Sequence, residues 1–175
     1  MTTLPVAPLA HPVRLATRSG MAITVRPATP DDDDTVAELF DAVSAEDRRF
    51  RFLSACNHIG ADQVAAITHV DHWQTESFLA FDEDGAAVAS GMLACDKGMR
   101  TAEVAISIRE DMKGRGIGWS LLEFLAGEAR RRGVQKLLSI ESRENHSTIE
   151  LEREMGFKAH AVDGDPTLVM LEAVF

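Results

Sequence analysis

Tyrosine is absent from this chain of 175 residues, and cysteine occurs only twice. Without tyrosine, no phenol can carry a proton in any reaction of this protein. Cys56 and Cys95 share no metal-binding or redox motif, so we expect free, buried thiols in a reducing cytoplasm. No apolar run reaches the roughly 18–20 residues that a membrane span needs, and residues 1–20 lack the apolar segment of a signal peptide. We therefore expect a cytoplasmic globular protein.

Positive charge is also scarce. Lysine and arginine number 18 against 28 aspartates and glutamates, which gives a net charge of −10. Nucleic-acid affinity depends on basic contacts to phosphate, so this balance argues against a nucleic-acid partner. It is compatible with a cationic substrate, although acidity also serves solubility. The length suits one domain. We expect residues 1–20 to form an N-terminal extension that can add a strand and residues 21–175 to form the domain, with Met21 as an alternative first residue.

The periodicity of apolar residues predicts a mixed α/β protein. Thr29 and Pro30 are good residues for the start of a helix, so the acids at 31–34 are interpreted as helix-start residues rather than as a metal site. Two short strands flank the turn at Ser19-Gly20, within residues 13–27. Further strands are expected at 77–82, 86–94, 101–109, 135–142, 157–162 and 167–175, and helices at 29–44, 44–53, 61–70, 117–133 and 145–156.

The segment "DMKGRGIGWS" at 111–120 carries three glycines at alternate positions. It lies between the longest predicted strand and an amphipathic helix. The first N–H groups of a helix lack partners and attract anions, and Gly114, Gly116 and Gly118 leave their backbone open to a close approach. Lys113 and Arg115 add positive charge. The segment predicts a site for a phosphate-bearing cofactor; the alternative is a tight turn whose glycines serve packing.

Two common phosphate motifs do not fit this segment. A P-loop needs G-x-x-x-x-G-K-[ST], which is absent. A dinucleotide fold needs G-x-G-x-x-G, whereas the chain has G-x-G-x-G. Glu141 does lie at the spacing of a ribose-binding acid, but too little chain follows for the second half of such a fold. A nucleotide-dependent oxidoreductase is therefore disfavoured.

The sequence "KGRGIG" resembles the R/Q-x-x-G-x-G/A signature of the GNAT (GCN5-related) N-acetyltransferases, and Lys113 stands where Arg or Gln is usual. "VAISI" before it and "NHSTIELEREMGF" after it extend the resemblance, which covers residues 22–175. It implies a mixed, mostly antiparallel sheet flanked by helices, with splayed central strands. "ITVRPATPDD", "SAEDRRFRFLS" and "ITHVDHWQTESFLAF" are similar to bacterial Pat-type protein lysine acetyltransferases. That family often carries a fused synthetase-like or cyclic-nucleotide domain, which we do not expect within this chain.

The resemblance implies transfer of an acetyl group from acetyl-CoA to an amine by direct attack in a ternary complex. Glu103 matches the proposed general base of the Pat-type family. The expected acceptor is a protein lysine; a small amine or amino acid, or a non-catalytic acetyl-CoA sensor, are the alternatives. A monomer or a homodimer is expected. The residues expected to bind acetyl-CoA are Ile106, Ser107, Ile108, Lys113, Gly114, Arg115, Gly116, Ile117, Gly118, Trp119 and Asn145.

Two positions have competing interpretations. Asn145 matches a position that contacts the cofactor, yet Asn is also a good helix N-cap. Glu152 stands where many members of the family have a tyrosine that protonates the departing thiolate. An ordinary glutamate is ionised at pH 7 unless burial raises its pKa, so we do not assign Glu152 as a general acid.

The remaining polar residues receive structural interpretations. His69, Asp71 and His72 lack further ligands nearby, so we expect no metal site. Trp73 and Glu76 either flank the acceptor cleft or form a plain surface loop. The second predicted helix carries three arginines, Arg48, Arg49 and Arg51, which are interpreted as ion-paired or solvated. A contact with cofactor phosphate is the alternative for these arginines. Phe50 and Phe52 of the same helix are interpreted as core residues.

Overall fold

The computed structural model describes residues 7–52 and 58–175, so Cys56 lies outside the described residues. The strands are β1 (Val13–Ala16), β2 (Ala22–Pro27), β3 (Thr75–Phe81), β4 (Ala87–Cys95), β5 (Thr101–Ile108), β6 (Lys136–Ser142), β7 (Lys158–Ala161) and β8 (Leu168–Val174). The helices are α1 (Asp33–Asp41), α2 (Ala45–Phe52), α3 (Ala61–Thr68), α4 (Ile117–Arg131) and α5 (His146–Glu154), with 3-10 turns at Pro30–Asp32 and Glu110–Met112.

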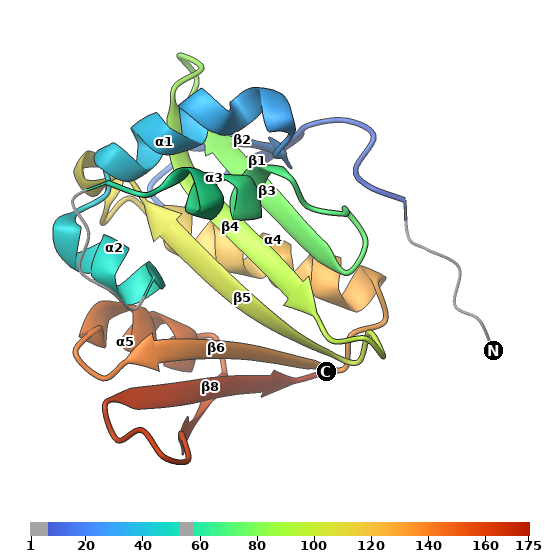
Figure 1. The fold of residues 1–175 in the computed structure, drawn as a ribbon, viewed down its shortest axis with the longest axis vertical. Coiled ribbons are helices and arrows are strands. Elements are labelled where there is room, and N and C mark those ends of the chain that lie inside the picture. Colours follow the sequence, from blue (N-terminus) through green and yellow to red (C-terminus); the bar gives the residue numbers. More distant parts are fainter. Residues whose placement is uncertain (1–6, 53–57) are drawn as a thin grey trace.

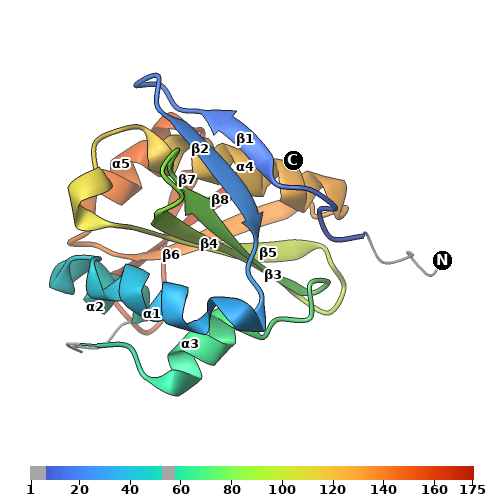
Figure 2. The ribbon, with the colours of Figure 1, turned by 90° about the horizontal axis from the view of Figure 1, so that it is seen from above.

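The strands form one sheet in the order β1-β2-β3-β4-β5-β6-β8-β7 (Figure 1). Every neighbouring pair is antiparallel except β5 and β6, which are parallel. Helices α1, α2 and α3 cover one face, and α4 and α5 cover the other (Figure 2). The prediction of a mixed, mostly antiparallel sheet flanked by helices is confirmed.

Helix α4 packs against the middle of the sheet through a stripe of apolar residues at four-residue steps. Ile117, Leu121, Leu125 and Ala129 are all buried, as the periodicity predicted. Gly91 on β4 lies beneath them: a Cβ there would stand 3.2 Å from Leu125 and 3.3 Å from Leu121. The missing side chain lets the helix lie close to β4, which fixes the start of α4 beside the end of β5.

Strands β5 and β6 pair over only part of their length. Within the described residues, their pairing covers three positions, from Thr101↔Lys136 to Glu103↔Leu138. Beyond Glu103 the two strands diverge, as Figure 1 shows, while β5 stays paired with β4 as far as Ile108. The edge of β5 that faces β6 therefore has free backbone groups along residues 104–108. This split is the splay that the family resemblance implied.

The acidic residues before α1 form a 3-10 turn, and one of them also makes an ion pair with a strand. Residues Pro30–Asp32 form a 3-10 turn, and α1 begins only at Asp33. The Asp32 carboxylate accepts the Thr29 backbone N–H at 2.8 Å and pairs with Arg26 at 2.7 Å. Arg26 holds the pKa of Asp32 below its usual value through this hydrogen bond. The interpretation as helix-start residues is consistent with this geometry, and the ion pair to β2 was not visible in the local pattern.

The end of α4 carries three consecutive arginines, Arg130–Arg132, which suit the negative end of the helix dipole. Arg132 among them is only 2% exposed. Its guanidinium lies 3.4 Å from Glu128 and 3.5 Å from Glu76, a carboxylate that is also buried. His72 contacts the same Glu76 at 2.7 Å. Glu76 is thus part of a buried ion-pair network, and the interpretation of this residue as part of a plain surface loop is wrong.

The two histidines singled out as metal candidates have different partners, since His69 lies 3.5 Å from Asp33. Across the described part of the chain, no group of three or more His, Cys, Asp or Glu residues is placed to hold a metal ion. Cys95 is buried and free. No helix within residues 7–52 and 58–175 is long and apolar enough to cross a membrane.

Candidate active site

The glycine segment turns the chain sharply between β5 and α4. Gly114 and Gly116 adopt left-handed φ angles of 76° and 83°, which side chains disfavour. Gly116 is also the N-cap of α4, where it leaves the first N–H groups of the helix directed away from the helix body. A Cβ on Gly118 would meet Ile108 at 3.3 Å, so this glycine lets the helix start pack on the end of β5.

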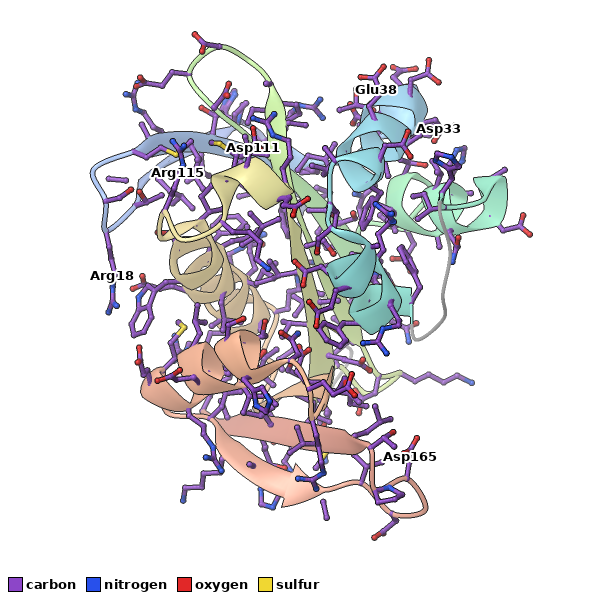
Figure 3. The ribbon with its side chains drawn as sticks, turned by 90° about the vertical axis from the view of Figure 1, so that its left-hand side faces the viewer. Arg18, Asp33, Glu38, Asp111, Arg115 and Asp165 are labelled. Atoms are coloured by element: carbon purple, nitrogen blue, oxygen red, sulfur yellow. The ribbon has the colours of Figure 1, made fainter. Side chains whose placement is uncertain are left out.

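The turn between β1 and β2 supports this loop from outside. The Ser19 hydroxyl donates to the Arg115 carbonyl oxygen at 2.7 Å. The Arg18 guanidinium stacks 3.3 Å above the Trp119 ring, a cation–π contact, and the Arg18 backbone nitrogen lies 3.2 Å from where a Gly116 Cβ would stand. Figure 3 shows Arg18 and Arg115 at the same edge of the molecule. A segment before the predicted domain therefore helps to shape the loop.

A cavity of about 420 Å³ opens between the diverging strands β5 and β6. It extends from the glycine loop to Glu103, and α2 and α5 add walls to it. Eleven of the twelve predicted site residues line it: Glu103, Ile106, Ser107, Ile108, Lys113, Gly114, Gly116, Ile117, Gly118, Trp119 and Asn145.

Arg115 is the exception. It is exposed and does not line the cavity, although it stands between two glycines that do. Its backbone carbonyl is used by Ser19. The contact of Arg115 with acetyl-CoA stays a prediction, and any such contact lies outside the cavity itself.

Helix α2 closes the cavity over the glycine loop through Asp47. The Ser44 hydroxyl accepts the Asp47 backbone N–H at 3.1 Å, which is one half of a capping box at the start of α2. The Asp47 carboxylate instead pairs with Lys113 at 2.7 Å. Lys113 is the residue that departs from the family's usual Arg or Gln, so its charge is balanced by a partner on α2.

The arginines and phenylalanines of α2 have different environments. Arg48 is buried and donates to the carbonyl oxygens of Phe40 and Val43. Arg49 pairs with Glu144 at 2.9 Å. Arg51 lines the cavity with Phe50, and its burial lowers the pKa of its guanidinium against the attraction of Glu103 and Glu141. Phe52 packs on the Phe40 ring at 5.4 Å. Phe50 thus belongs to the cavity wall rather than to the core beside Phe52.

Two glutamates lie inside the cavity, on β6 and α5. Glu141 accepts hydrogen bonds from Ser139 at 2.9 Å and from Asn145 at 3.0 Å, and burial raises its pKa. Glu152 is 3% exposed, and burial together with the neighbouring Glu141 charge raises its pKa to about 8. Asn145 stands at the N-cap of α5 but makes no side-chain capping bond. Its amide serves Glu141 instead.

This burial makes the stability of the protein depend on pH. Folded Glu152 keeps its proton up to a pKa of about 8, whereas the unfolded chain loses it near 4.5. Unfolding therefore releases a proton in this range, and rising pH favours it. We expect the free energy of unfolding of the wild type to fall, relative to Glu152→Gln, by up to about 1.4 kcal/mol per pH unit.

Denaturant unfolding at several values from pH 5 to pH 8 measures this difference. Glu150→Gln, a change at an exposed residue of the same helix, keeps Glu152 and should therefore show the same pH dependence as the wild type. Parallel curves for the wild type and Glu152→Gln would contradict the protonated burial of Glu152.

The cavity residues that the sequence analysis missed or set aside include five with charged or hydroxyl side chains: Asp47, Arg51, Ser139, Glu141 and Glu152. The sequence analysis noted Glu141 only because its spacing from the glycine segment matches that of a ribose-binding acid in dinucleotide folds. The period of two along β6 places Ser139 and Glu141 on one face, and that signal could have identified both. Glu152 was judged ionised because its burial cannot be read from local sequence.

Comparisons with known proteins agree with this geometry. The model of the acetyltransferase (GNAT) family matches residues 41–157. An acetyltransferase of Pseudomonas aeruginosa is 26% identical over 156 residues, which cover 86% of this chain and 83% of the relative.

Solved structures share the fold. The GNAT domain of S. lividans PAT superposes with a TM-score of 0.87 and 24% identity, over 94% of this chain and 97% of that one. The structure of yncA from Salmonella typhimurium, described as an acetyltransferase and solved with its cofactor acetyl-CoA, superposes with a TM-score of 0.66 and 18% identity. The match covers 87% of this chain and 93% of that one.

Proposed function

The chain belongs to the GNAT family of acetyltransferases, and we propose that it transfers the acetyl group of acetyl-CoA to the amine of a lysine side chain on a protein. Acetyl transfer from acetyl-CoA is the chemistry of the family. The acceptor is inferred from the shape and charge of the cavity. The single observation that carries it is the position of Glu103, which is exposed at the end of the cavity.

We assign the glycine loop to the diphosphate of acetyl-CoA. The backbone N–H groups at the start of α4 favour an anion there. The pantetheine arm then follows the free edge of β5 along residues 104–108, where its amides can replace the missing strand partner. The Ser107 hydroxyl lines this stretch, is buried and has no hydrogen-bond partner within the described residues, which supports a ligand contact.

We assign Glu103 as the general base. At about 3.3 Å per residue, the β5 backbone places Glu103 roughly 17 Å from Ile108 and hence from the start of the loop. The acyl end of an extended cofactor reaches that level. A lysine amine has an ordinary pKa near ~10.4, so a base must take its proton, directly or through water, before the nitrogen attacks the thioester carbonyl.

A lysine on a protein surface fits this end of the cavity better than a small buried amine. Glu103 is exposed, so a side chain carried by a second protein can reach it. Glu103 and Glu141 both act on Arg51, which leaves two carboxylates against one guanidinium. Together with the net charge of −10, they favour a cationic acceptor. The likeness to the GNAT domain of S. lividans PAT agrees with this choice.

The test uses acetyl-CoA, a panel of folded proteins and lysine peptides, and a parallel panel of amino acids and small amines. Thiol release gives the rate, and mass spectrometry locates the acetyl groups. Lysine acetylation of proteins at rates well above those for small amines supports the proposal. Acetylation confined to small amines would overturn the acceptor, and tight acetyl-CoA binding without transfer to any amine would indicate a sensor.

A further inference from the structure

Helix α2 directs one arginine side chain into the cavity. Arg51 lines the cavity and is partly buried. Within the described residues, its guanidinium makes no hydrogen bond to an oxygen atom. It donates to the Met92 sulfur at 3.1 Å and lies 5.1 Å from the Phe52 ring. A desolvated guanidinium has five N–H donors that usually find oxygen acceptors, so donors without them inside a cavity point to a contact with a ligand.

The pairing of β4 with β5 gives the level of this guanidinium. Met92 on β4 stands opposite Ala105 on β5, and directly paired residues carry their side chains on the same face of a sheet. Side chains alternate along β5, so Glu103, Ala105 and Ser107 share that face. The Arg51 guanidinium therefore lies near the level of Ala105, which is two residues, or about 7 Å, from both Glu103 and Ser107.

This level is where the proposed reaction takes place. Under the proposed function, the pantetheine arm follows residues 104–108 and Glu103 takes the proton of the amine. The thioester carbonyl then lies between the arm and the base, close to Ala105. Desolvation lowers the pKa of Arg51, but the charges of Glu103 and Glu141 oppose this effect. The guanidinium therefore stays a cation beside the reacting group.

We propose that Arg51 is a catalytic residue that donates a hydrogen bond to the carbonyl oxygen of the thioester and stabilises the negative charge that forms on this oxygen. The proposal rests on the proposed transfer from acetyl-CoA in this cavity, and it holds for a lysine or a small amine as acceptor. A donor that is already in position contributes most where charge develops in the transition state. A guanidinium supplies both the N–H group and a full positive charge.

The step balances in atoms and electrons. The amine nitrogen gives a proton to the Glu103 carboxylate and forms a bond to the carbonyl carbon, and the π electrons of the carbonyl move onto its oxygen. Arg51 stabilises this oxyanion by hydrogen bonding and keeps its own protons. When the carbonyl re-forms, the carbon–sulfur bond breaks with its electron pair on sulfur. The thiolate takes a proton from water, and Glu103 returns its proton to water.

The first test observes the hydrogen bond without any transfer. Difference infrared spectroscopy, with acetyl-CoA isotopically labelled at the carbonyl carbon, reports the thioester C=O stretch in the wild type and in Arg51→Met. Methionine keeps most of the length of the side chain but removes the charge and every donor. We expect the band to lie at lower wavenumber in the wild type than in free acetyl-CoA, and to return toward the free value in Arg51→Met.

The second test measures steady-state thiol release with whichever amine the wild type acetylates. We expect kcat to fall by about 100- to 1,000-fold in Arg51→Met. The KM for acetyl-CoA should change less than about threefold, because the interaction strengthens only in the transition state. Arg51→Lys keeps the charge and should retain more activity than Arg51→Met. Arg49→Met, a change at the exposed arginine that pairs with Glu144, is the control and should match the wild type in both tests.

A purely structural role of Arg51 predicts the opposite order of the variants, because methionine suits the contacts with Met92 and Phe52 better than a desolvated lysine does. Arg51→Met at least as active as Arg51→Lys would overturn the proposal. A carbonyl band unchanged in Arg51→Met would do the same, since a free N–H group of β5 would then be the donor. A wild type that binds acetyl-CoA but acetylates no amine would refute the proposed function, and the band would still test the contact of Arg51.

Discussion

Replacing Glu103 with glutamine is expected to lower kcat for acetyl transfer by about 100- to 1,000-fold at pH 7. The amide has nearly the shape of the carboxylate but cannot accept the amine proton. Glu103 is exposed at the end of the cavity, so the change should leave folding and acetyl-CoA binding intact. The measurement is steady-state thiol release, together with calorimetric titration of acetyl-CoA into each variant.

The loss should shrink as pH rises. Near pH 10 a lysine amine is largely neutral without assistance, and the base becomes unnecessary. Glu110→Gln, an exposed residue just beyond β5, is the control and should behave as the wild type. A Glu103→Gln enzyme with unchanged kcat, or with a defect that is constant across pH, would show that Glu103 is not the base.

Replacing Gly116 with alanine is expected to weaken acetyl-CoA binding by at least about tenfold. A left-handed residue with a Cβ is strained by about 1–2 kcal/mol, and the Gly116 Cβ would lie 3.2 Å from the Arg18 backbone nitrogen. Either the loop or the β1–β2 turn must shift, and the N–H groups at the start of α4 then leave the positions that we assign to the diphosphate. Calorimetric titration measures the loss.

Gly133 provides a matched control at the other end of the same helix. Its φ of 82° is equally left-handed, but among the described residues no atom beyond its chain neighbours lies within 4 Å of the point where a Cβ would stand. Gly133→Ala should lose stability to backbone strain and keep its affinity for acetyl-CoA. Equal losses of affinity in both variants would mean that the effect arises from general destabilisation. Unchanged acetyl-CoA affinity in Gly116→Ala would show that the glycine loop is not part of the binding site.

The features predictable from sequence are those encoded locally. Apolar residues alternate along β5 and recur at four-residue steps along α4. Together with the three glycines between them, these patterns predict a loop between the end of a strand and the start of a helix. Glu103 was identified through the family resemblance, and the structure places it in the same cavity as the loop. Its role as base remains a prediction.

The features that escaped depend on contacts between distant segments. The protonation of Glu152 is set by burial and by Glu141, a residue on another element. The carboxylate of Asp47, in the first turn of α2, pairs with Lys113, 66 positions along the chain. Arg132, at the end of α4, is buried with Glu76. In each case the local sequence fits the helix that carries the residue, but the surroundings of the side chain depend on a residue far away in the sequence.

A crystal structure of the complex with acetyl-CoA tests the central claim most directly. We predict acetyl-CoA in the split between β5 and β6, with its diphosphate against the backbone of residues 114–119 and its thioester carbonyl facing Glu103. Acetyl-CoA bound outside the split, or with its diphosphate away from the glycine loop, would contradict the account.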